Sequence, residues 1–396
     1  MVERNPHFHA LSPNYLFPEI HKRKMAFQKN SPEAKILSLG IGDTTQPIAQ
    51  SITSAMQQKA QELSTKEGYT GYGAPEGMQE LRKQIATTWY ETVEADEIFI
   101  SDGAKCDCGR LAVLFGGETT VAVQDPAYPV YVDSTLITGN PERLHFMPCT
   151  PDNNFFPDLN HAPATDLIYL CYPNNPTGTV ATHKQLEAFV AFAKANNSII
   201  IYDAAYAGFI RNPDIPKTIY AIPGAKEVAI EINSFSKLTG FTGVRLGWTV
   251  IPKELTYTDG SPVHPDWARL HSTLFNGASN VVQAGGLAAL TPHGLEQIKK
   301  RIDYYLINAH RLKEVFMQAK LDTYGGKHAP FLFVHFPGQD SWDLFDLFLK
   351  KAHLVTTPGV GFGPSGESFL RFSAFGNRAD IDEACSRLAE FLPTLT

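Results

Sequence analysis

The chain has 396 residues, of which 43% are hydrophobic and 19% are charged, and its formal net charge at pH 7 is −7. This length exceeds what one hydrophobic core usually holds, so we expect two domains in an ordinary globular protein. The acidic balance argues against nucleic acid as a partner, because phosphate backbones need a concentrated positive surface, and it leaves small metabolites as the expected ligands.

The first residues predict neither an export signal nor a membrane anchor. The start, MVERNPHFHALSPNYLF, has charges and prolines where a signal peptide has its apolar core. No later run reaches the roughly 18 apolar residues that a membrane span needs. Five scattered cysteines suit reduced thiols better than disulfides, and Cys106 and Cys108 have no second pair to complete a metal site. We therefore expect a cytoplasmic protein without a bound metal.

Residues 1–45 are rich in Pro and Asn and show little periodicity, so we expect them to wrap onto the C-terminal domain or a partner subunit. From about residue 78 to 250, helical patterns alternate with short apolar runs. Predicted helices span 77–94, 103–115, 126–137 and 182–196, and predicted strands span 97–101, 119–125, 166–171, 198–203 and 227–232. The alternation is typical of an α/β fold, with a mostly parallel central sheet and helices on both faces. We assign residues 46–290 to this large domain.

The C-terminal part, residues 291–396, has a different order of elements. A long helical pattern at 293–320 precedes an alternating strand at 331–336, and another helix, a strand near 353–356 and a final helix follow. This order predicts a smaller α+β domain.

Polar residues follow three of the predicted strands. The strand at 198–203 ends in Asp203, the strand at 227–232 leads into SFSK at 234–237, and the strand at 166–171 leads into YPNNPTG at 172–178. Because the carboxyl ends of parallel strands collect binding groups at one edge of a sheet, we expect a site there. Asp203 either caps a following helix or projects into the site to hold a cationic ring nitrogen.

The stretch SFSKLTGFTGVRLGW (234–248) places one lysine and one arginine among small, hydroxylic and apolar residues. Lys237 is easily desolvated there, which lowers its pKa and favours attack on a carbonyl carbon, as a Schiff-base lysine requires. Ser234, Ser236 and Arg245 supply hydroxyls and a planar cation that suit a phosphate dianion. The alternative is a loop with two solvated charges. The turn SDGAKCD (101–107) would add the N–H groups of a helix N-terminus, which also favour an anion.

The motifs YPNNPTG, IIYDAAY (200–206), SFSK and GVRLGW together resemble those of the fold-type I pyridoxal-phosphate aminotransferases, in the family's order and over nearly the entire chain. Longer strings, among them NYLFPEI (14–20), DPAYPVYVDS (125–134) and FNGASNVVQAGG (275–286), are similar to the LL-diaminopimelate aminotransferase family. The resemblance implies the fold of the fold-type I transferases, pyridoxal 5′-phosphate as the cofactor, and a homodimer with active sites shared between subunits.

The resemblance also implies a role for each matched residue. Lys237 would be the catalytic Schiff-base lysine, Asp203 would pair with the pyridinium nitrogen, and Arg371 would clamp the substrate α-carboxylate rather than lie on the surface. Tyr72 would reach the phosphate of the neighbouring subunit's cofactor. The remaining implied contacts are Ala104, Lys105, Ser234, Ser236 and Arg245 for the phosphate, Asn175, Tyr206 and Tyr128 for the ring, and Tyr15, Gly42, Lys105, Tyr128, Asn175 and Asn276 for substrate, with Asn276 also near the cofactor.

The implied reaction transfers an amino group between LL-2,6-diaminopimelate and 2-oxoglutarate, giving glutamate and, after cyclisation, tetrahydrodipicolinate, in lysine and diaminopimelate biosynthesis. One segment departs from the family's pattern, in which a Glu-Gln pair commonly precedes the glycine after the matched tyrosine. Here Pro75 holds the place of the acid and Glu76 lies one position on, so we expect looser discrimination among diamino acids.

Two other functions use the same residue patterns. A carbon–sulfur lyase or an aminotransferase for aromatic or broad substrates would share Lys237 and Asp203, although Tyr15, Asn276 and the FNGASN string favour the diaminopimelate enzymes. A non-catalytic ligand-binding protein of the same fold would be expected to lose the lysine, which is present.

Overall fold

The apolar runs in the middle of the chain form one seven-stranded sheet in the order β2-β8-β7-β6-β5-β3-β4. The computed structural model describes residues 2–11, 16–40, 42–139 and 141–395. The strands are β2 (Ile98–Ser101), β3 (Val121–Asp125), β4 (Leu144–Pro148), β5 (Leu167–Cys171), β6 (Ile199–Asp203), β7 (Ala229–Ser234) and β8 (Gly247–Val250). Their Val- and Ile-rich runs are buried on both faces, as parallel sheets require. Among the described strands of this sheet, β8 alone runs antiparallel to its neighbours.

The register brings the expected strand ends together. Ser101 at the end of β2 and Ser234 at the end of β7 both pair with Gly247. Cys171 at the end of β5 pairs with Asp203 at the end of β6. The polar segments that follow these strands therefore leave the sheet along one edge.

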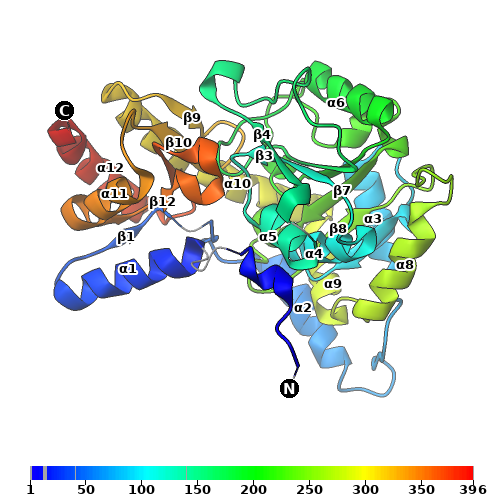
Figure 1. Cartoon of the computed structure of the whole chain (residues 1–396). Coiled ribbons are helices and arrows are strands. Elements are labelled where there is room, and N and C mark those ends of the chain that lie inside the picture. The colour runs from blue at the N-terminus through cyan, green and yellow to red at the C-terminus, as the bar shows by residue number, and fades with distance from the viewer. Residues whose placement is uncertain (1, 12–15, 41, 140, 396) are drawn as a thin grey trace.

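Helices pack on both faces of this sheet (Figure 1). One face packs against α3 (Gln79–Trp89) and α6 (His183–Asn196) in the largest hydrophobic core, and the other against α4 (Ala104–Phe115), α5 (Val130–Thr138) and α8 (Val263–Leu274) in a second core. Two further helices, α2 (Gln50–Glu62) and α9 (Asn280–Ala289), pack on each other. The prediction of a mostly parallel sheet with helices on both faces is confirmed.

The C-terminal elements build a separate antiparallel sheet with its own core. Its order is β12-β13-β10-β9, and it packs with α10, α11 and α12. The bounds are β9 (Thr323–Gly325), β10 (Phe331–His335), β12 (Thr357–Pro358), β13 (Phe369–Ser373), α10 (Pro292–Gln318), α11 (Ser341–Leu347) and α12 (Arg378–Phe391). Helix α10 contributes Ile302 to the central core and Phe316 to the C-terminal core, so it joins the two regions. The domain limits at residues 45 and 290 stay predictions.

The N-terminal segment lies against the C-terminal elements. Helix α1 (Leu16–Asn30), blue in Figure 1, runs beside the orange and red elements and buries Leu16 and Ile20 in their core. Strand β1 (Leu37–Ser38) pairs in parallel with β11 (Leu354–Val355). None of the described helices combines the length and apolar character that a membrane crossing requires.

The structure differs from the sequence predictions at several elements. Helix α1 was not predicted, because most of its side chains are polar and only Leu16 and Ile20 are buried. Strand β4 lies at the edge of the sheet with most of its side chains partly or fully exposed, so it lacks an apolar run. Strand β8 has only four residues and begins with glycine. The helix predicted at 77–94 is shorter and spans Gln79–Trp89.

Candidate active site

A cavity of about 530 Å³ opens at the edge where these strands end. It is lined by most of the residues that the sequence singled out, namely Gly42, Ala104, Lys105, Tyr128, Asn175, Asp203, Tyr206, Ser234, Ser236, Lys237, Arg245 and Arg371. These residues come from both ends of the chain and from the central and C-terminal sheets. The parallel topology brings together those that follow β5, β6 and β7, since each strand delivers its next loop to the same edge, whereas Arg371 reaches the cavity from β13 of the C-terminal sheet.

Three predicted residues are not among those that line the cavity. Tyr72 is 92% exposed and Asn276 is also exposed, so neither reaches this cavity from its own chain. Tyr15 lies outside the described residues.

Lys237 lies on α7 (Phe235–Thr239), a short helix that begins where β7 ends. The Ser234 side chain caps this helix by accepting a hydrogen bond of 3.0 Å from the backbone N–H of Ser236. The Lys237 amine donates to the carbonyl oxygen of Gly42. The pKa of Lys237 is lowered to about 8, mainly by burial and also by the nearby cations Arg371 and Arg245, while Asp43 opposes the change. A lysine with this pKa is partly neutral near physiological pH and is therefore a competent nucleophile and base.

Asp203 is a buried carboxylate whose two oxygens each accept a hydrogen bond. Oδ2 accepts from the hydroxyl of Tyr131 at 2.7 Å, and Oδ1 accepts from the backbone N–H of Ala205 at 2.9 Å. Burial raises the pKa of Asp203, while these two hydrogen bonds oppose the rise by stabilising the charged form. Each oxygen keeps capacity for a further donor, such as a protonated ring nitrogen.

The turn before α4 and the loop after α7 together form a cradle for an anion. Gly103 precedes α4 with φ +124° and no side-chain cap, so the first N–H groups of the helix are available to a ligand. A Cβ at Gly103 would lie 2.4 Å from Nη2 of Arg245, so only glycine permits this approach. Nη1 of Arg245 donates to Oγ of Ser236 at 3.3 Å. These donors match the phosphate contacts expected from the sequence.

Arg371, on β13, is a buried cation with 1% of its surface exposed. Nη1 donates to Oδ1 of Asn175 at 2.7 Å, and Nη2 donates to the carbonyl oxygen of Gly40 at 2.5 Å. The guanidinium lies between the rings of Phe331 and Phe362, 4.6 and 4.8 Å from their centroids. Burial lowers its pKa to about 10, and Nε is buried without a partner among the described residues. The group is therefore held rigidly beside the cavity, and the donors it uses here go to neutral acceptors.

Sequence reasoning missed two residues. The hydroxyl of Tyr131 donates a hydrogen bond to Asp203, and the negative charge of Asp43 raises the pKa of Lys237. The signal for Tyr131 was its place three residues after Tyr128, in the first turn of the helix that begins at Val130. Both tyrosines line the cavity. Asp43 lies in a loop without a periodic pattern, and nothing in the sequence pointed to it.

Among the described residues that line the cavity, the charged side chains are four cations, Lys105, Lys237, Arg245 and Arg371, and two carboxylates, Asp43 and Asp203. This excess of positive charge suits a ligand with a phosphate and a carboxylate. The arrangement also offers an amine for a carbonyl carbon and a buried carboxylate for a ring nitrogen. These residues therefore fit pyridoxal 5′-phosphate with an amino-acid substrate.

Comparison with known proteins gives the same assignment. Residues 34–388 match the family described as aminotransferase class I and II. The chain is 52% identical to the LL-diaminopimelate aminotransferase of Protochlamydia amoebophila, with 99% of this chain and 98% of that protein aligned. It is 54% identical to the chloroplastic LL-diaminopimelate aminotransferase of Arabidopsis thaliana, over 98% of this chain and 87% of that protein.

A solved structure shows the same likeness in three dimensions. The L,L-diaminopimelate aminotransferase of Chlamydomonas reinhardtii superposes with a TM-score of 0.95 at 55% identity, covering 98% of both chains.

Proposed function

The chain belongs to the class I and II aminotransferases and, within them, to the LL-diaminopimelate aminotransferases, and from this membership we propose that it transfers an amino group between LL-2,6-diaminopimelate and 2-oxoglutarate. The products would be glutamate and an oxo acid that cyclises to tetrahydrodipicolinate, in lysine and diaminopimelate biosynthesis. The observation that carries the proposal is the convergence of Lys237, Asp203 and Arg371 on one cavity, in a chain more than half identical to enzymes of that name.

The cofactor of this family is pyridoxal 5′-phosphate, which when bound supplies an electron sink for the bonding electrons at the substrate α-carbon. Ser234, Ser236, Arg245 and the N-terminus of α4 would hold its phosphate, and Lys237 would bind its carbonyl carbon. Asp203 would keep a proton on the ring nitrogen, because a buried carboxylate favours a neighbouring positive charge.

Arg371 would orient the substrate by binding its α-carboxylate through two N–H donors. The amine of Lys237, once free, would take the proton from the substrate α-carbon and return it to a neighbouring carbon. Its pKa of about 8 suits both steps, because the neutral and protonated forms are then close in energy. Both substrates carry an α-carboxylate, so one arginine serves both half-reactions.

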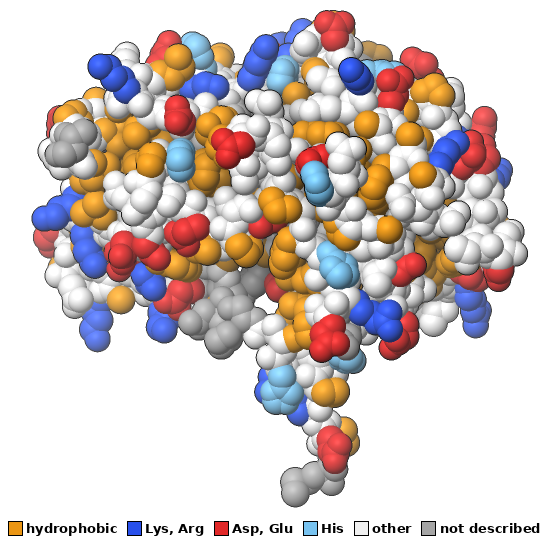
Figure 2. Space-filling view, turned by 45° about the horizontal axis from the view of Figure 1, so that its top comes forward, with side chains coloured by type: hydrophobic (Ala, Val, Ile, Leu, Met, Phe, Trp, Pro, Cys, Tyr) orange, Lys and Arg blue, Asp and Glu red, His pale blue; other side chains and the backbone are white. Residues whose placement is uncertain are grey.

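We also propose that the chain acts as a homodimer in which Tyr72 and Asn276 serve the neighbouring subunit's site. Supporting this, large apolar and aromatic side chains near these positions are exposed: Tyr69 is 68% exposed, Tyr72 92% and Leu274 55%. Figure 2 shows the first described residues, 2–11, projecting from the body of the molecule, and Val2 and Phe8 among them are also exposed. Exposed aromatic residues of this kind are typical of subunit interfaces.

We propose a cytoplasmic location, supported by five cysteines that are all free thiols. Cell fractionation followed by detection of the protein would test it, and recovery in an organelle or in the secreted fraction would contradict it.

The test of the proposed reaction is a single half-reaction. Purified protein loaded with pyridoxal phosphate is mixed with LL-diaminopimelate, and the visible absorbance should change from that of the aldehyde form of the cofactor to that of its amine form. Adding 2-oxoglutarate should reverse the change. The Lys237→Ala variant should bind cofactor without the conversion. If an aromatic amino acid converts the cofactor to its amine form and LL-diaminopimelate does not, the protein is instead an aminotransferase for aromatic substrates.

A further inference from the structure

Asp107 is a fully buried acid in the first turn of α4 that does not line the cavity. Both of its carboxylate oxygens accept hydrogen bonds. Oδ2 accepts from Oγ of Ser101 at 2.5 Å and from Oγ1 of Thr249 at 2.8 Å, and Oδ1 accepts from Nη1 of Arg110 at 2.9 Å. Burying a carboxylate is costly unless it is fully paired, so this one is held by three separate donors.

These contacts lead directly to the anion cradle. Oγ of Ser101, which donates to Asp107, accepts a hydrogen bond of 3.2 Å from the backbone N–H of Gly103. Gly103 lies against the guanidinium of Arg245 and directly precedes α4. Asp107 therefore fixes, through Ser101, the turn that presents the first N–H groups of the helix.

The hydrogen bond from Thr249 ties strand β8 to the same turn. Thr249 lies on β8, two residues after Gly247, whose added Cβ would lie 2.9 Å from Cα of Gly103. The hydrogen bond from Thr249 to Asp107 thus holds β8 against the turn. Arg245 lies two residues before Gly247, so the same hydrogen bond helps to keep its guanidinium against Gly103.

Arg110 connects this cluster to a second segment. Its Nη1 donates to Asp107 and, at 2.8 Å, to Oδ1 of Asp102, and its guanidinium lies 4.5 Å from the centre of the Phe275 ring. Only 11% of the side chain is exposed. Phe275 directly precedes Asn276, which we expect to reach the neighbouring subunit's site. Arg110 thus pairs with both Asp102 and Asp107 and also packs on Phe275, next to Asn276.

We propose that Asp107 and Arg110 are positioning residues for the cofactor's phosphate, which hold the 101–105 turn and Arg245 in the geometry that binds it. The inference rests on the proposed function, since it concerns the same cofactor. Neither residue lines the cavity, so Asp107 acts through Ser101, Gly103 and Thr249, and Arg110 acts through Asp107 and Asp102. If the hydrogen bonds to Asp107 are lost, the N–H groups of the turn and Arg245 are still present but are free to shift. The phosphate is then bound less tightly.

The test compares pyridoxal phosphate with pyridoxal, which lacks the phosphate. Apoenzyme is titrated with each compound, and the two dissociation constants are obtained from the absorbance that develops when the aldehyde binds. The measured quantity is the ratio of the pyridoxal constant to the pyridoxal phosphate constant. A residue that only stabilises the fold changes both constants alike, whereas a phosphate-positioning residue lowers the ratio.

Two substitutions separate positioning from simple charge effects. Asp107→Asn removes a negative charge near the cradle, so an electrostatic effect alone would raise the ratio, whereas loss of positioning lowers it. We expect a fall of about tenfold, the size typical of a lost hydrogen bond to a buried charge. Arg110→Met removes the cation that pairs with Asp107 and Asp102 and should lower the ratio by a similar factor. A fall in both variants is the result that supports the proposal.

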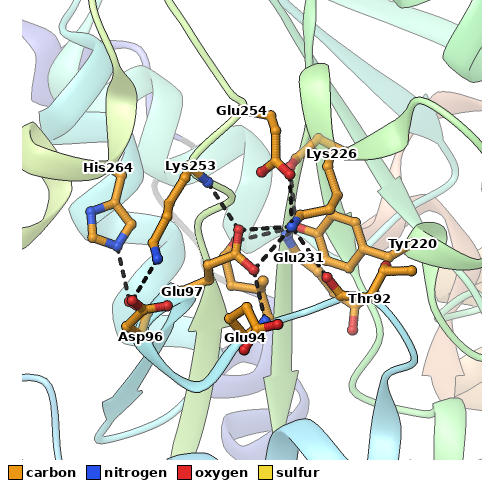
Figure 3. A network of polar contacts seen from close by, with 12 residues as sticks. Thr92, Glu94, Asp96, Glu97, Tyr220, Lys226, Glu231, Lys253, Glu254 and His264 are labelled. Atoms are coloured by element: carbon orange, nitrogen blue, oxygen red, sulfur yellow. Dashed lines mark hydrogen bonds and ion pairs between the residues drawn. The ribbon is translucent and has the colours of Figure 1, made fainter.

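Glu97→Gln is the matched control. Glu97 is also a buried acid, 1% exposed, but it directly precedes β2, at the opposite end of that strand from Ser101. It accepts from the backbone N–H groups of Glu94 and Lys253 and pairs with Lys226 at 3.0 Å (Figure 3). This variant should lose thermal stability with an unchanged ratio.

The remaining outcomes are distinct. If Asp107→Asn does not fold, Thr249→Val removes one donor at a similar side-chain volume and should lower the ratio about threefold. An unchanged or higher ratio in the Asp107 and Thr249 variants overturns the inference while leaving the proposed function intact. Wild-type apoenzyme that does not bind pyridoxal phosphate would instead overturn the proposed function.

Discussion

Arg371 on β13 donates a hydrogen bond of 2.7 Å from Nη1 to Oδ1 of Asn175, in the loop that follows β5. The bond joins the C-terminal sheet to the edge of the central sheet. It fixes the guanidinium beside the cavity before any substrate arrives, so little side-chain entropy remains to be lost on binding.

We expect Arg371→Lys to raise the KM of both the amino donor and the oxo acceptor by roughly 100-fold, about 3 kcal/mol, because lysine cannot reproduce two parallel donors. Steady-state kinetics with each substrate varied in turn provide the measurement. Arg378→Lys is the control, since Arg378 packs on the ring of Tyr304 at 4.5 Å and is not among the residues that line the cavity. A rise in KM for only one of the two substrates would contradict a shared carboxylate clamp.

The lowered pKa of Lys237 predicts how fast apoenzyme captures pyridoxal phosphate at different pH values. The neutral amine attacks the aldehyde, and its pKa is about 8, so the rate should increase with pH up to that value and then level off. Below the pKa the increase should be about tenfold per pH unit. Stopped-flow absorbance measures the rate of covalent capture, and Lys237→Ala, which can hold the cofactor only noncovalently, should show no such change in absorbance. A rate that keeps rising to about pH 10 would indicate an ordinary lysine.

The hydrogen bond from Tyr131 to Asp203 should set the acid limb of the activity profile. Burial raises the pKa of Asp203 and the Tyr131 hydroxyl lowers it, so Tyr131→Phe should raise that pKa further. The carboxyl then protonates at a higher pH, and we expect the acid limb to move upward by up to about one pH unit.

The matched control for this prediction is Tyr169→Phe. Tyr169 stacks on Tyr131 with ring centroids 5.0 Å apart, and its hydroxyl is buried without a partner among the described residues. Removing that hydroxyl leaves Asp203 unaffected, so the profile should stay in place. Equal displacement by both substitutions would show that general repacking, rather than the hydrogen bond, is responsible.

Sequence reasoning located the centre of the site because the relevant signals are local. A buried apolar run that ends in a polar residue marks a strand end, and parallel strands deliver their ends to one edge, so Asp203 and the segment with Lys237 were predicted to meet. The structure brings both to one cavity. The Gly103 turn was predicted on the same basis.

Other features depend on tertiary packing and could not be read locally. The contact between Tyr131 and Asp203 arises from how α5 packs on the sheet, and α1 is stabilised by the C-terminal core rather than by its own polar pattern. The cluster around Asp107 joins α4 and β8, which are more than 130 residues apart in the sequence. Tyr72 and Asn276 were predicted from the resemblance, and a single chain leaves them exposed.

The replacement of an acid by Pro75 predicts relaxed recognition of the distal end of the substrate. Glu76 is half-buried and its backbone carbonyl accepts a hydrogen bond of 2.8 Å from Ile100, so its position is held by β2. We expect kcat/KM values for LL-diaminopimelate, meso-diaminopimelate and lysine that lie within about tenfold of one another. Pro75→Glu should increase the preference for the LL isomer. A wild-type preference above roughly a thousandfold, about 4 kcal/mol, would refute this.

If Tyr72 serves the neighbouring subunit's site, two variants that are each inactive should restore activity when they form a mixed dimer. Lys237→Ala retains a normal Tyr72 to lend, and Tyr72→Ala retains a normal Lys237, so a mixed dimer has one site with both residues intact. Refolding the two variants together at equal amounts should recover about a quarter of the wild-type activity, because half of the dimers are mixed and each has one intact site.

The control mixture pairs Lys237→Ala with Asp203→Ala, since both residues line the same chain's cavity. Every site in that mixture lacks one of them, so no activity should return. Recovery in the first mixture alone would assign Tyr72 to the neighbouring subunit's site, and failure of the first mixture would mean that each chain is complete by itself.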